Sequence, residues 1–111
     1  MNNTLPEHAP LTQFPIQDNC LQIGGISLTR LAHRVGTTPF YAYDRHKITE
    51  RIGLLRQHLP TEIQLHYAMK ANPMPAVVQL LAGLVDGIDV ASAGEMKIAL
   101  DTPLPPDNIS F

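Results

Sequence analysis

Between positions 63 and 70, large apolar residues alternate with polar or small ones. A period of two is typical of a strand that buries one face and leaves the other open. We therefore predict a strand over 63–70, with its open face ending at Lys70. Its apolar set is Ile63, Leu65, Tyr67 and Met69, and its opposite set is Gln64, His66, Ala68 and Lys70.

One helix is predicted before this strand and another after it. The first follows Asp44, which can cap it, and ends at Pro60. The second follows Asn72, a candidate cap, with Pro73 tolerated in its first turn. The apolar stripes are Ile48, Ile52, Leu55 and Leu59 in the first helix and Val77, Leu80, Leu81 and Leu84 in the second.

The C-terminal part of the chain continues the same alternation. Residues 87–91 predict a second strand, and residues 108–111 predict the beginning of a third. Between them, Ser92–Glu95 matches the S-x-x-E capping box, which predicts a helix through Leu100. Strands that alternate with helices at this spacing are typical of parallel βαβ units. The predicted fold class is therefore α/β.

The N-terminal part carries weaker patterns. Residues 1–20 show no periodicity and contain several prolines, so we expect a disordered or extended leader. A short strand is predicted over 21–23, and Ser27 can cap a helix that Gly36 ends. Residues 40–43, rich in aromatic side chains at strand spacing, indicate a further strand.

Composition limits the possible partners. The chain has 111 residues, 44% of them hydrophobic and 16% charged, with a net charge of −2. One modest core is expected, and no basic field is present to attract nucleic acid or anionic lipid. The single Cys20 excludes an internal disulfide and suits a reducing compartment, and no apolar run is long enough to cross a membrane. We expect a cytoplasmic protein without nucleic-acid or membrane partners, and no metal site, because the histidines lie in different elements.

Lys70 is the first candidate for chemistry, because open α/β sheets and (β/α)8 barrels place their active sites at the carboxyl ends of strands. An uncharged lysine amine at such a place can attack an aldehyde and form a Schiff base. A lysine that extends into solvent explains the same pattern. The residues alone leave both interpretations open.

Three motifs, Thr37–Asp44, Tyr67–Asn72 and Asp89–Glu95, carry a resemblance to a known family. In order and spacing they resemble the fold-type III pyridoxal-phosphate decarboxylases, which include diaminopimelate and ornithine decarboxylases. The stretches Pro73–Pro75 and Ala91–Thr102 are similar to the exosortase-system-associated branch of that family. The resemblance implies the N-terminal part of a (β/α)8 TIM barrel.

The resemblance also implies how the chain is divided. Residues 1–20 would be the leader, residues 21–38 a segment that packs with a second, β-rich domain, and residues 39–111 the first βα units of the barrel. A complete barrel takes about 250 residues, and the family's phosphate loop and partner-subunit residues lie far downstream. We therefore expect 111 residues to be a truncated portion that is inactive alone.

The resemblance assigns roles to five side chains. Lys70 is expected to hold pyridoxal phosphate as an aldimine, and Asp89 to lie beside it. Glu95 is expected near the same site, although the capping box alone explains this residue. Ala68 and His66 share the strand face of Lys70 and are expected to help bind the cofactor. The alternatives are a histidine satisfied inside the barrel for His66 and a loop-facing strand end for Asp89.

The implied activity is removal of the α-carboxylate from an amino acid that is diaminopimelate-like or ornithine- or lysine-like, with that choice left open. A homodimer is also implied. Two alternatives stand beside this interpretation. One is a racemase-like enzyme of the same fold type, which the Pro73–Pro75 stretch after the lysine argues against. The other is a non-catalytic fragment that acts only by interaction.

Overall fold

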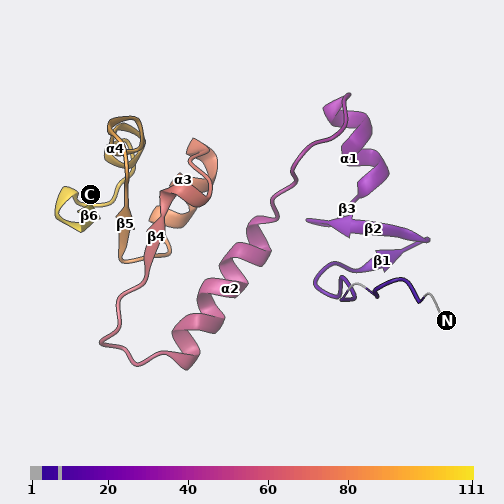
Figure 1. Cartoon of the computed structure of the whole chain (residues 1–111), viewed down its shortest axis with the longest axis horizontal. Coiled ribbons are helices and arrows are strands. Elements are labelled where there is room, and N and C mark those ends of the chain that lie inside the picture. Colours follow the sequence, from indigo (N-terminus) through magenta and orange to yellow (C-terminus); the bar gives the residue numbers. More distant parts are fainter. Residues whose placement is uncertain (1–3, 8) are drawn as a thin grey trace. The chain divides into compact units, whose positions relative to one another are not determined.

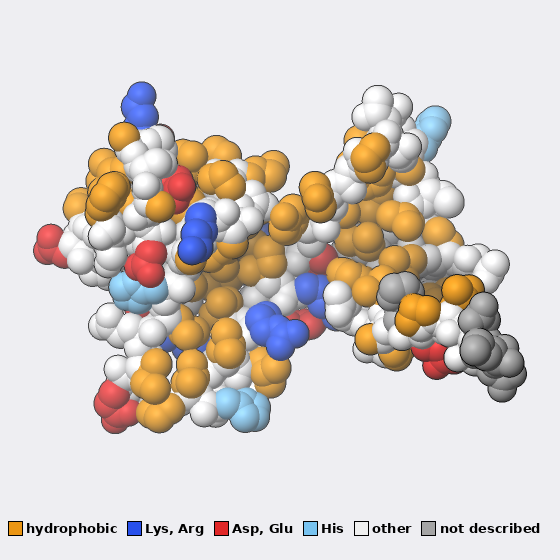
Figure 2. Space-filling model, viewed as in Figure 1, with side chains coloured by type: hydrophobic (Ala, Val, Ile, Leu, Met, Phe, Trp, Pro, Cys, Tyr) orange, Lys and Arg blue, Asp and Glu red, His pale blue; other side chains and the backbone are white. Residues whose placement is uncertain are grey.

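The structure is a computed structural model that describes residues 4–7 and 9–111. It consists of two compact units, Met1–Asp44 and Arg45–Phe111, whose elements are labelled in Figure 1. No helix within the described residues combines the length and the apolar character needed to cross a membrane. Acidic and basic side chains are interspersed over the face shown in Figure 2, as the small net charge leads one to expect.

The first unit is a small antiparallel sheet followed by a helix. Strands β1 (Ile16–Gln17), β2 (Cys20–Ile23) and β3 (Ile26–Ser27) pair in that order. The turn between β2 and β3 consists of two glycines with positive φ, Gly24 at 59° and Gly25 at 76°. A two-residue turn with positive φ at both residues matches the twist of the two strands that it joins, and glycine adopts positive φ most easily.

Helix α1 (Leu28–Val35) confirms the predicted start and stop signals. The hydroxyl of Ser27 accepts a hydrogen bond from the N–H of Arg30, and Gly36 ends the helix with φ at 82°. The side-chain oxygen of the capping residue accepts from a first-turn N–H that has no partner within the helix. At the other end, a glycine in the left-handed conformation ends the last turn.

Two stretches of this unit differ from the sequence patterns. The described part of residues 1–20 contains β1, which no periodicity indicated; residues 1–3 and 8 of the expected leader lie outside the described residues. Residues 40–43 form no strand, and Tyr41 is 92% exposed. The prediction of a strand there was wrong, because aromatic spacing makes a strand only where a neighbouring strand supplies hydrogen bonds.

The second unit consists of βα units around a parallel sheet. Strands β4 (His66–Ala68), β5 (Gly87–Asp89) and β6 (Ile109–Ser110) pair in parallel in that order. The helices are α2 (Arg45–His58), α3 (Pro75–Ala82) and α4 (Ala93–Leu100), with short 3-10 turns at Met69–Ala71 and Pro106–Asn108 (Figure 1). The predicted strand, helix, strand order is confirmed.

The two faces of the parallel sheet differ in character. Tyr67, Ile88 and Ile109 lie in register and pack into one core with residues of α2, α3 and α4. The fully or nearly buried members of that core are Met69, Val77, Val78, Leu81, Ala82, Val85, Ile88, Val90 and Ala99. The neighbouring positions Ala68, Asp89 and Ser110 point to the opposite face because side chains alternate along a strand. That opposite face is polar and exposed.

The segment around Lys70 differs from the prediction in two ways. The strand is only three residues long, so Lys70 lies in the 3-10 turn that follows β4 rather than on the strand itself. Helix α3 begins at Pro75 instead of after Asn72. The reason is steric: a residue before proline is kept out of the helical region, and Asn72 (ψ 106°) and Met74 (ψ 123°) both precede prolines and lie outside that region. The buried stripe of α3 therefore begins at Val77 and Val78.

Asp86 joins several elements at the amino ends of the parallel strands. Its Oδ2 accepts hydrogen bonds from Nη1 of Arg56 at 2.7 Å and from the N–H of Leu65 at 2.8 Å. Its backbone carbonyl accepts one from Nδ2 of Asn108 at 2.9 Å. The hydrogen bond from Arg56, and after it that from Leu65, lowers the pKa of Asp86 below its ordinary value. These hydrogen bonds tie α2 and the amino ends of the strands together, at the sheet edge opposite Lys70.

Candidate functional site

The candidate residues lie at or just beyond the carboxyl edge of the parallel sheet. Asp89 ends β5, and Ala68 on β4 and Ser110 on β6 are its partners in register. Lys70 lies two residues beyond Ala68, in the turn that leaves β4. Because parallel strands all end at the same edge, Ala68, Asp89 and Ser110 form one row at the place where α/β sheets bind ligands, and Lys70 lies in the turn just beyond it. Glu95 lies in the first turn of α4, which follows β5.

The turn that carries Lys70 is held from both ends. Met69 before it is fully buried in the core. Across the turn, the Tyr67 hydroxyl donates to the carbonyl of Asn72 at 2.8 Å, and Oδ1 of Asn72 accepts from the N–H of Met74 at 3.0 Å. Lys70 itself is exposed, and its amine has no hydrogen-bond or ion-pair partner within residues 4–7 and 9–111. The backbone is fixed while the amine stays available.

His66 and Asp89 form an ion pair or charge-assisted hydrogen bond across β4 and β5, with Nδ1 of His66 3.0 Å from Oδ1 of Asp89. An ionised carboxylate only accepts, so Nδ1 carries the proton and donates it. The His66 side chain is 31% exposed and that of Asp89 is 53% exposed. The sequence offered no sign of this contact, because it depends on the register between two strands.

Glu95 acts as the return arm of the predicted capping box. Its N–H donates to the Ser92 hydroxyl at 3.1 Å, and its Oε1 accepts from the N–H of Ala91 at 3.2 Å. The Ser92 hydroxyl also lies 3.5 Å from Oε2 of Glu95. In the described part of the chain no hydrogen bond joins Glu95 to Lys70 or Asp89. The Ser92 half of the box is thus as predicted, whereas the carboxylate of Glu95 reaches the N–H of Ala91, one residue before the cap.

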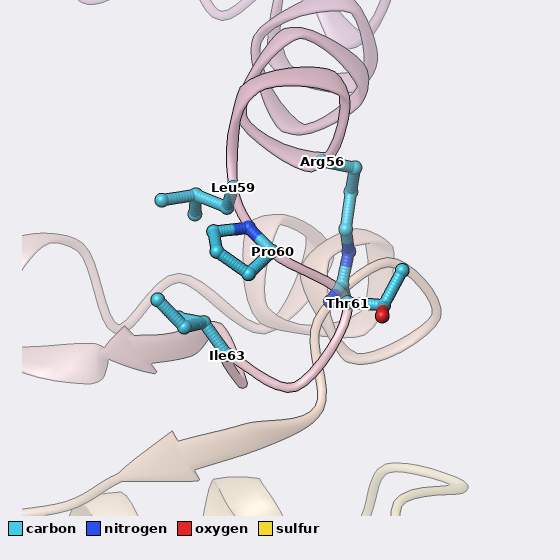
Figure 3. A pocket seen from close by; sticks show the side chains of 5 residues that line it. All are labelled: Arg56, Leu59, Pro60, Thr61 and Ile63. Atoms are coloured by element: carbon cyan, nitrogen blue, oxygen red, sulfur yellow. The ribbon is translucent and has the colours of Figure 1, made fainter.

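Two hollows are lined by other residues. One of about 190 Å³, lined by Arg56, Leu59, Pro60, Thr61 and Ile63, lies where α2 leads into the loop before β4 (Figure 3). Leu59, Pro60 and Ile63 gather on one side of that loop, and the guanidinium of Arg56 is already bound to Asp86. A second, mainly apolar hollow of about 500 Å³ lies in the first unit, between α1 and residues 38–42. Neither contains a residue that the sequence singled out for chemistry.

The groups at the carboxyl edge fit an aldehyde-bearing cofactor. An uncharged lysine amine without a partner can bond to an aldehyde carbon whose oxygen leaves as water, and a carboxylate at the same edge can take up and return the proton that moves from nitrogen to oxygen. The small side chain of Ala68 leaves room beside Asp89. Among the described residues, no three His, Cys, Asp or Glu side chains gather as a metal site would require.

Comparison with known proteins shows the family to which the chain belongs. The family model of the pyridoxal-dependent decarboxylases, pyridoxal binding domain, matches residues 45–111. The chain belongs to this family. The match confirms pyridoxal phosphate as the family's cofactor, and it identifies the βα units of the second unit as the N-terminal part of a (β/α)8 barrel.

Individual pyridoxal-dependent decarboxylases are similar over a limited part of their length. A diaminopimelate decarboxylase of Aquifex aeolicus is 37% identical over 107 residues, which cover 96% of this chain and 24% of that protein. A lysine/ornithine decarboxylase of Selenomonas ruminantium is 50% identical over 68 residues, or 61% of this chain and 17% of that protein. The crystal structure of AQ1208 from Aquifex aeolicus matches with a TM-score of 0.76 and 39% identity, over 86% of this chain and 24% of that one. The chain thus spans a quarter or less of these relatives.

Sequence reasoning missed three residues that lie around the candidate groups. Tyr67 braces the turn of Lys70, and the signal was a tyrosine in an apolar stripe, whose hydroxyl needs a partner when buried. Gly87 lies under the His66 ring, and a glycine beginning a strand can mark a close approach. Ser110 is in register with Asp89, which no feature of the sequence indicated.

Proposed function

We propose that this chain provides the lysine to which an amino-acid decarboxylase attaches pyridoxal phosphate. The observation that carries the proposal is the exposed amine of Lys70, which lies unpaired at the carboxyl edge of the parallel sheet of a pyridoxal-binding domain. An amine that is bound to neither a carboxylate nor a carbonyl is free to react, whereas Lys47 already pairs with Glu50 at 3.3 Å.

Each residue of the proposed site has a distinct role. Lys70 forms the covalent link to the cofactor aldehyde. Asp89 accepts a hydrogen bond or proton at the same edge, through the Oδ2 that its contact with His66 does not use. Ala68 lies on the face on which the cofactor rests, His66 lies two residues before it and contacts Asp89, and Glu95 adds a second carboxylate at the amino end of α4. When bound, the pyridine ring accepts the electron pair that a departing carboxylate leaves behind.

The substrate follows from the chemistry that the relatives' names state. Diaminopimelate, lysine and ornithine are amino acids with a second charged group at the far end of the side chain. We propose that the protein removes the α-carboxylate of such an amino acid. The proposal includes a cytoplasmic homodimer, in which residues 39–111 form the first βα units of the barrel and residues 21–38 pack with a β-rich domain. The family match over 45–111 supports the barrel part of this division.

A lysine series tests the proposal. The sequence contains three lysines, Lys47, Lys70 and Lys97. Full-length protein that contains residues 1–111 is titrated with pyridoxal phosphate, and the visible absorption band of lysine-bound cofactor is followed. We expect Lys70→Ala to lose this band, while Lys47→Ala and Lys97→Ala retain it. A Lys70→Ala variant with an undiminished band would refute the proposal.

A further inference from the structure

The His66 ring lies directly against the backbone of Gly87. His66 and Gly87 are partners in the register of β4 and β5. A Cβ atom at position 87 would lie 2.5 Å from Cε1 and 2.8 Å from Nδ1 of His66. Atoms that are not bonded cannot approach so closely, so only a glycine leaves room for the imidazole in this position. The missing side chain of Gly87 on β5 therefore leaves the space that the His66 ring occupies.

The ring reaches from Gly87 to the carboxylate of Asp89. Its Nδ1 donates to Oδ1 at 3.0 Å. Because one oxygen is used in this way, rotation of the carboxylate is restricted, and Oδ2 is left without a partner among the residues that the structure describes. A hydrogen bond to an ionised acceptor is stronger than a neutral one and fixes orientation more firmly.

His66 is poorly placed to act on the carboxyl edge itself. It begins β4, whereas Lys70 follows the end of that strand. Each strand residue advances about 3.3 Å, so His66 lies about 7 Å before Ala68 along the strand. Asp89, by contrast, is in register with Ala68. An effect of His66 on the site therefore passes through Asp89.

We propose that His66 is a positioning residue: its imidazole, received by Gly87, holds Asp89 so that the free Oδ2 faces the edge where Lys70 presents its amine. This inference rests on the proposed function, because it assigns the partner that orients one of its carboxylates. It differs from a direct contact between His66 and the cofactor, and from a histidine that only fills space in the sheet.

Two substitutions of His66 separate these roles. Phenylalanine keeps a flat ring over Gly87 but has no donor. Asparagine loses the ring but keeps an N–H close to the place of Nδ1. If donation to Asp89 is the role, His66→Phe weakens the binding of pyridoxal phosphate about threefold to fivefold, the size typical of a partly exposed ion pair, while His66→Asn stays within about twofold of the unchanged protein. Circular dichroism of each variant checks that the fold is retained.

Coupling to Asp89 gives the second measurement. Asp89→Ala is made alone and together with His66→Phe in the full-length protein that contains residues 1–111. Because both substitutions break one interaction, the double variant should bind the cofactor no more weakly than Asp89→Ala alone. Additive losses, or equal losses for phenylalanine and asparagine at position 66, would overturn the proposal.

Nitrogen NMR of the cofactor-free protein tests the same contact without using the cofactor. At a pH where the imidazole is neutral, His66 should carry its proton on Nδ1, and Asp89→Ala should shift the proton toward Nε2. Finding it on Nε2 in the unchanged protein overturns the positioning role. If the tautomer is as expected but the unchanged protein binds no pyridoxal phosphate at Lys70, the proposed function fails, and the role of His66 fails with it.

Discussion

Replacing Gly87 with alanine tests the close packing between the two strands that carry the site. The new Cβ would meet three atoms at less than 3 Å: Cε1 and Nδ1 of His66, at 2.5 and 2.8 Å, and the backbone carbonyl oxygen of Asn108, at 2.7 Å. The His66 ring can turn away only by giving up its hydrogen bond to Asp89. The carbonyl of Asn108 belongs to the turn that leads into β6, so relieving that contact moves a neighbouring strand.

The cost follows from these contacts. Forcing one methyl group into a filled space costs about 1–3 kcal/mol, and losing a partly exposed hydrogen bond adds about 0.5–1 kcal/mol. We therefore expect Gly87→Ala to lower the free energy of unfolding by about 2–3 kcal/mol. Gly53 in α2 is the matched control, since a Cβ there meets nothing within 4 Å. Alanine in place of a glycine inside a helix stabilises by about 0.5–1 kcal/mol, so the two variants should shift in opposite directions.

The assay combines urea unfolding, followed by circular dichroism, with hydrogen exchange of the amides in β4 and β5. Exchange localises the effect even if the whole protein does not unfold in one step. The expected result is a lower urea midpoint and faster exchange in these strands for Gly87→Ala alone. A Gly87→Ala variant as stable as Gly53→Ala, with unchanged exchange, would refute the packing that we describe.

Two further predictions concern other parts of the second unit. Because the hydrogen bond from Arg56 lowers the pKa of folded Asp86 below its ordinary value of 3.8, this pair stabilises the fold above that pH and loses its effect as the pH falls through the lower folded value. Asp86→Asn should remove about 1 kcal/mol of stability at neutral pH and flatten the dependence of the melting temperature on pH below 4; an unchanged slope would contradict this. Ser92→Ala should destabilise α4 by about 1 kcal/mol, measured by thermal unfolding, because the cap of its first turn is lost. Glu95→Gln, whose amide oxygen can still accept from the backbone, should leave stability within about 0.5 kcal/mol of the unchanged protein. Any loss of cofactor binding in that variant would therefore report a role in the site. A stability loss as large as that of Ser92→Ala would contradict the cap.

Local signals predicted the ends of helices well. Ser27, Gly36 and the Ser92–Glu95 box act through the backbone groups of one helical turn, and all three occupy the predicted positions. In the alternation that ends at Lys70, Met69 is buried and Lys70 exposed as predicted, whereas Ile63, the first of the apolar set, is exposed. These signals depend only on residues close together in the chain, which is why the sequence reveals them.

Features that depend on distant residues were predicted less well. The strand over 63–70 contracts to three residues because its length is set by pairing with the short strand β5. One failure has a local cause instead: the helix after Lys70 begins late because Pro73 and Pro75 keep the residues before them out of the helical region, which outweighs the capping preference of Asn72. The contact between His66 and Asp89 requires both the register of two strands and the space above Gly87, so neither residue reveals it alone.

The central claim is that Lys70 is the residue that bonds to the cofactor, and chemical trapping tests it most directly. Full-length protein containing residues 1–111 is incubated with pyridoxal phosphate, reduced with borohydride, digested and mapped by mass spectrometry. We predict a pyridoxyl group on the peptide that contains Lys70, and none on those that contain Lys47 or Lys97. A reduced protein labelled at either of these lysines, with Lys70 unmodified, would contradict the account.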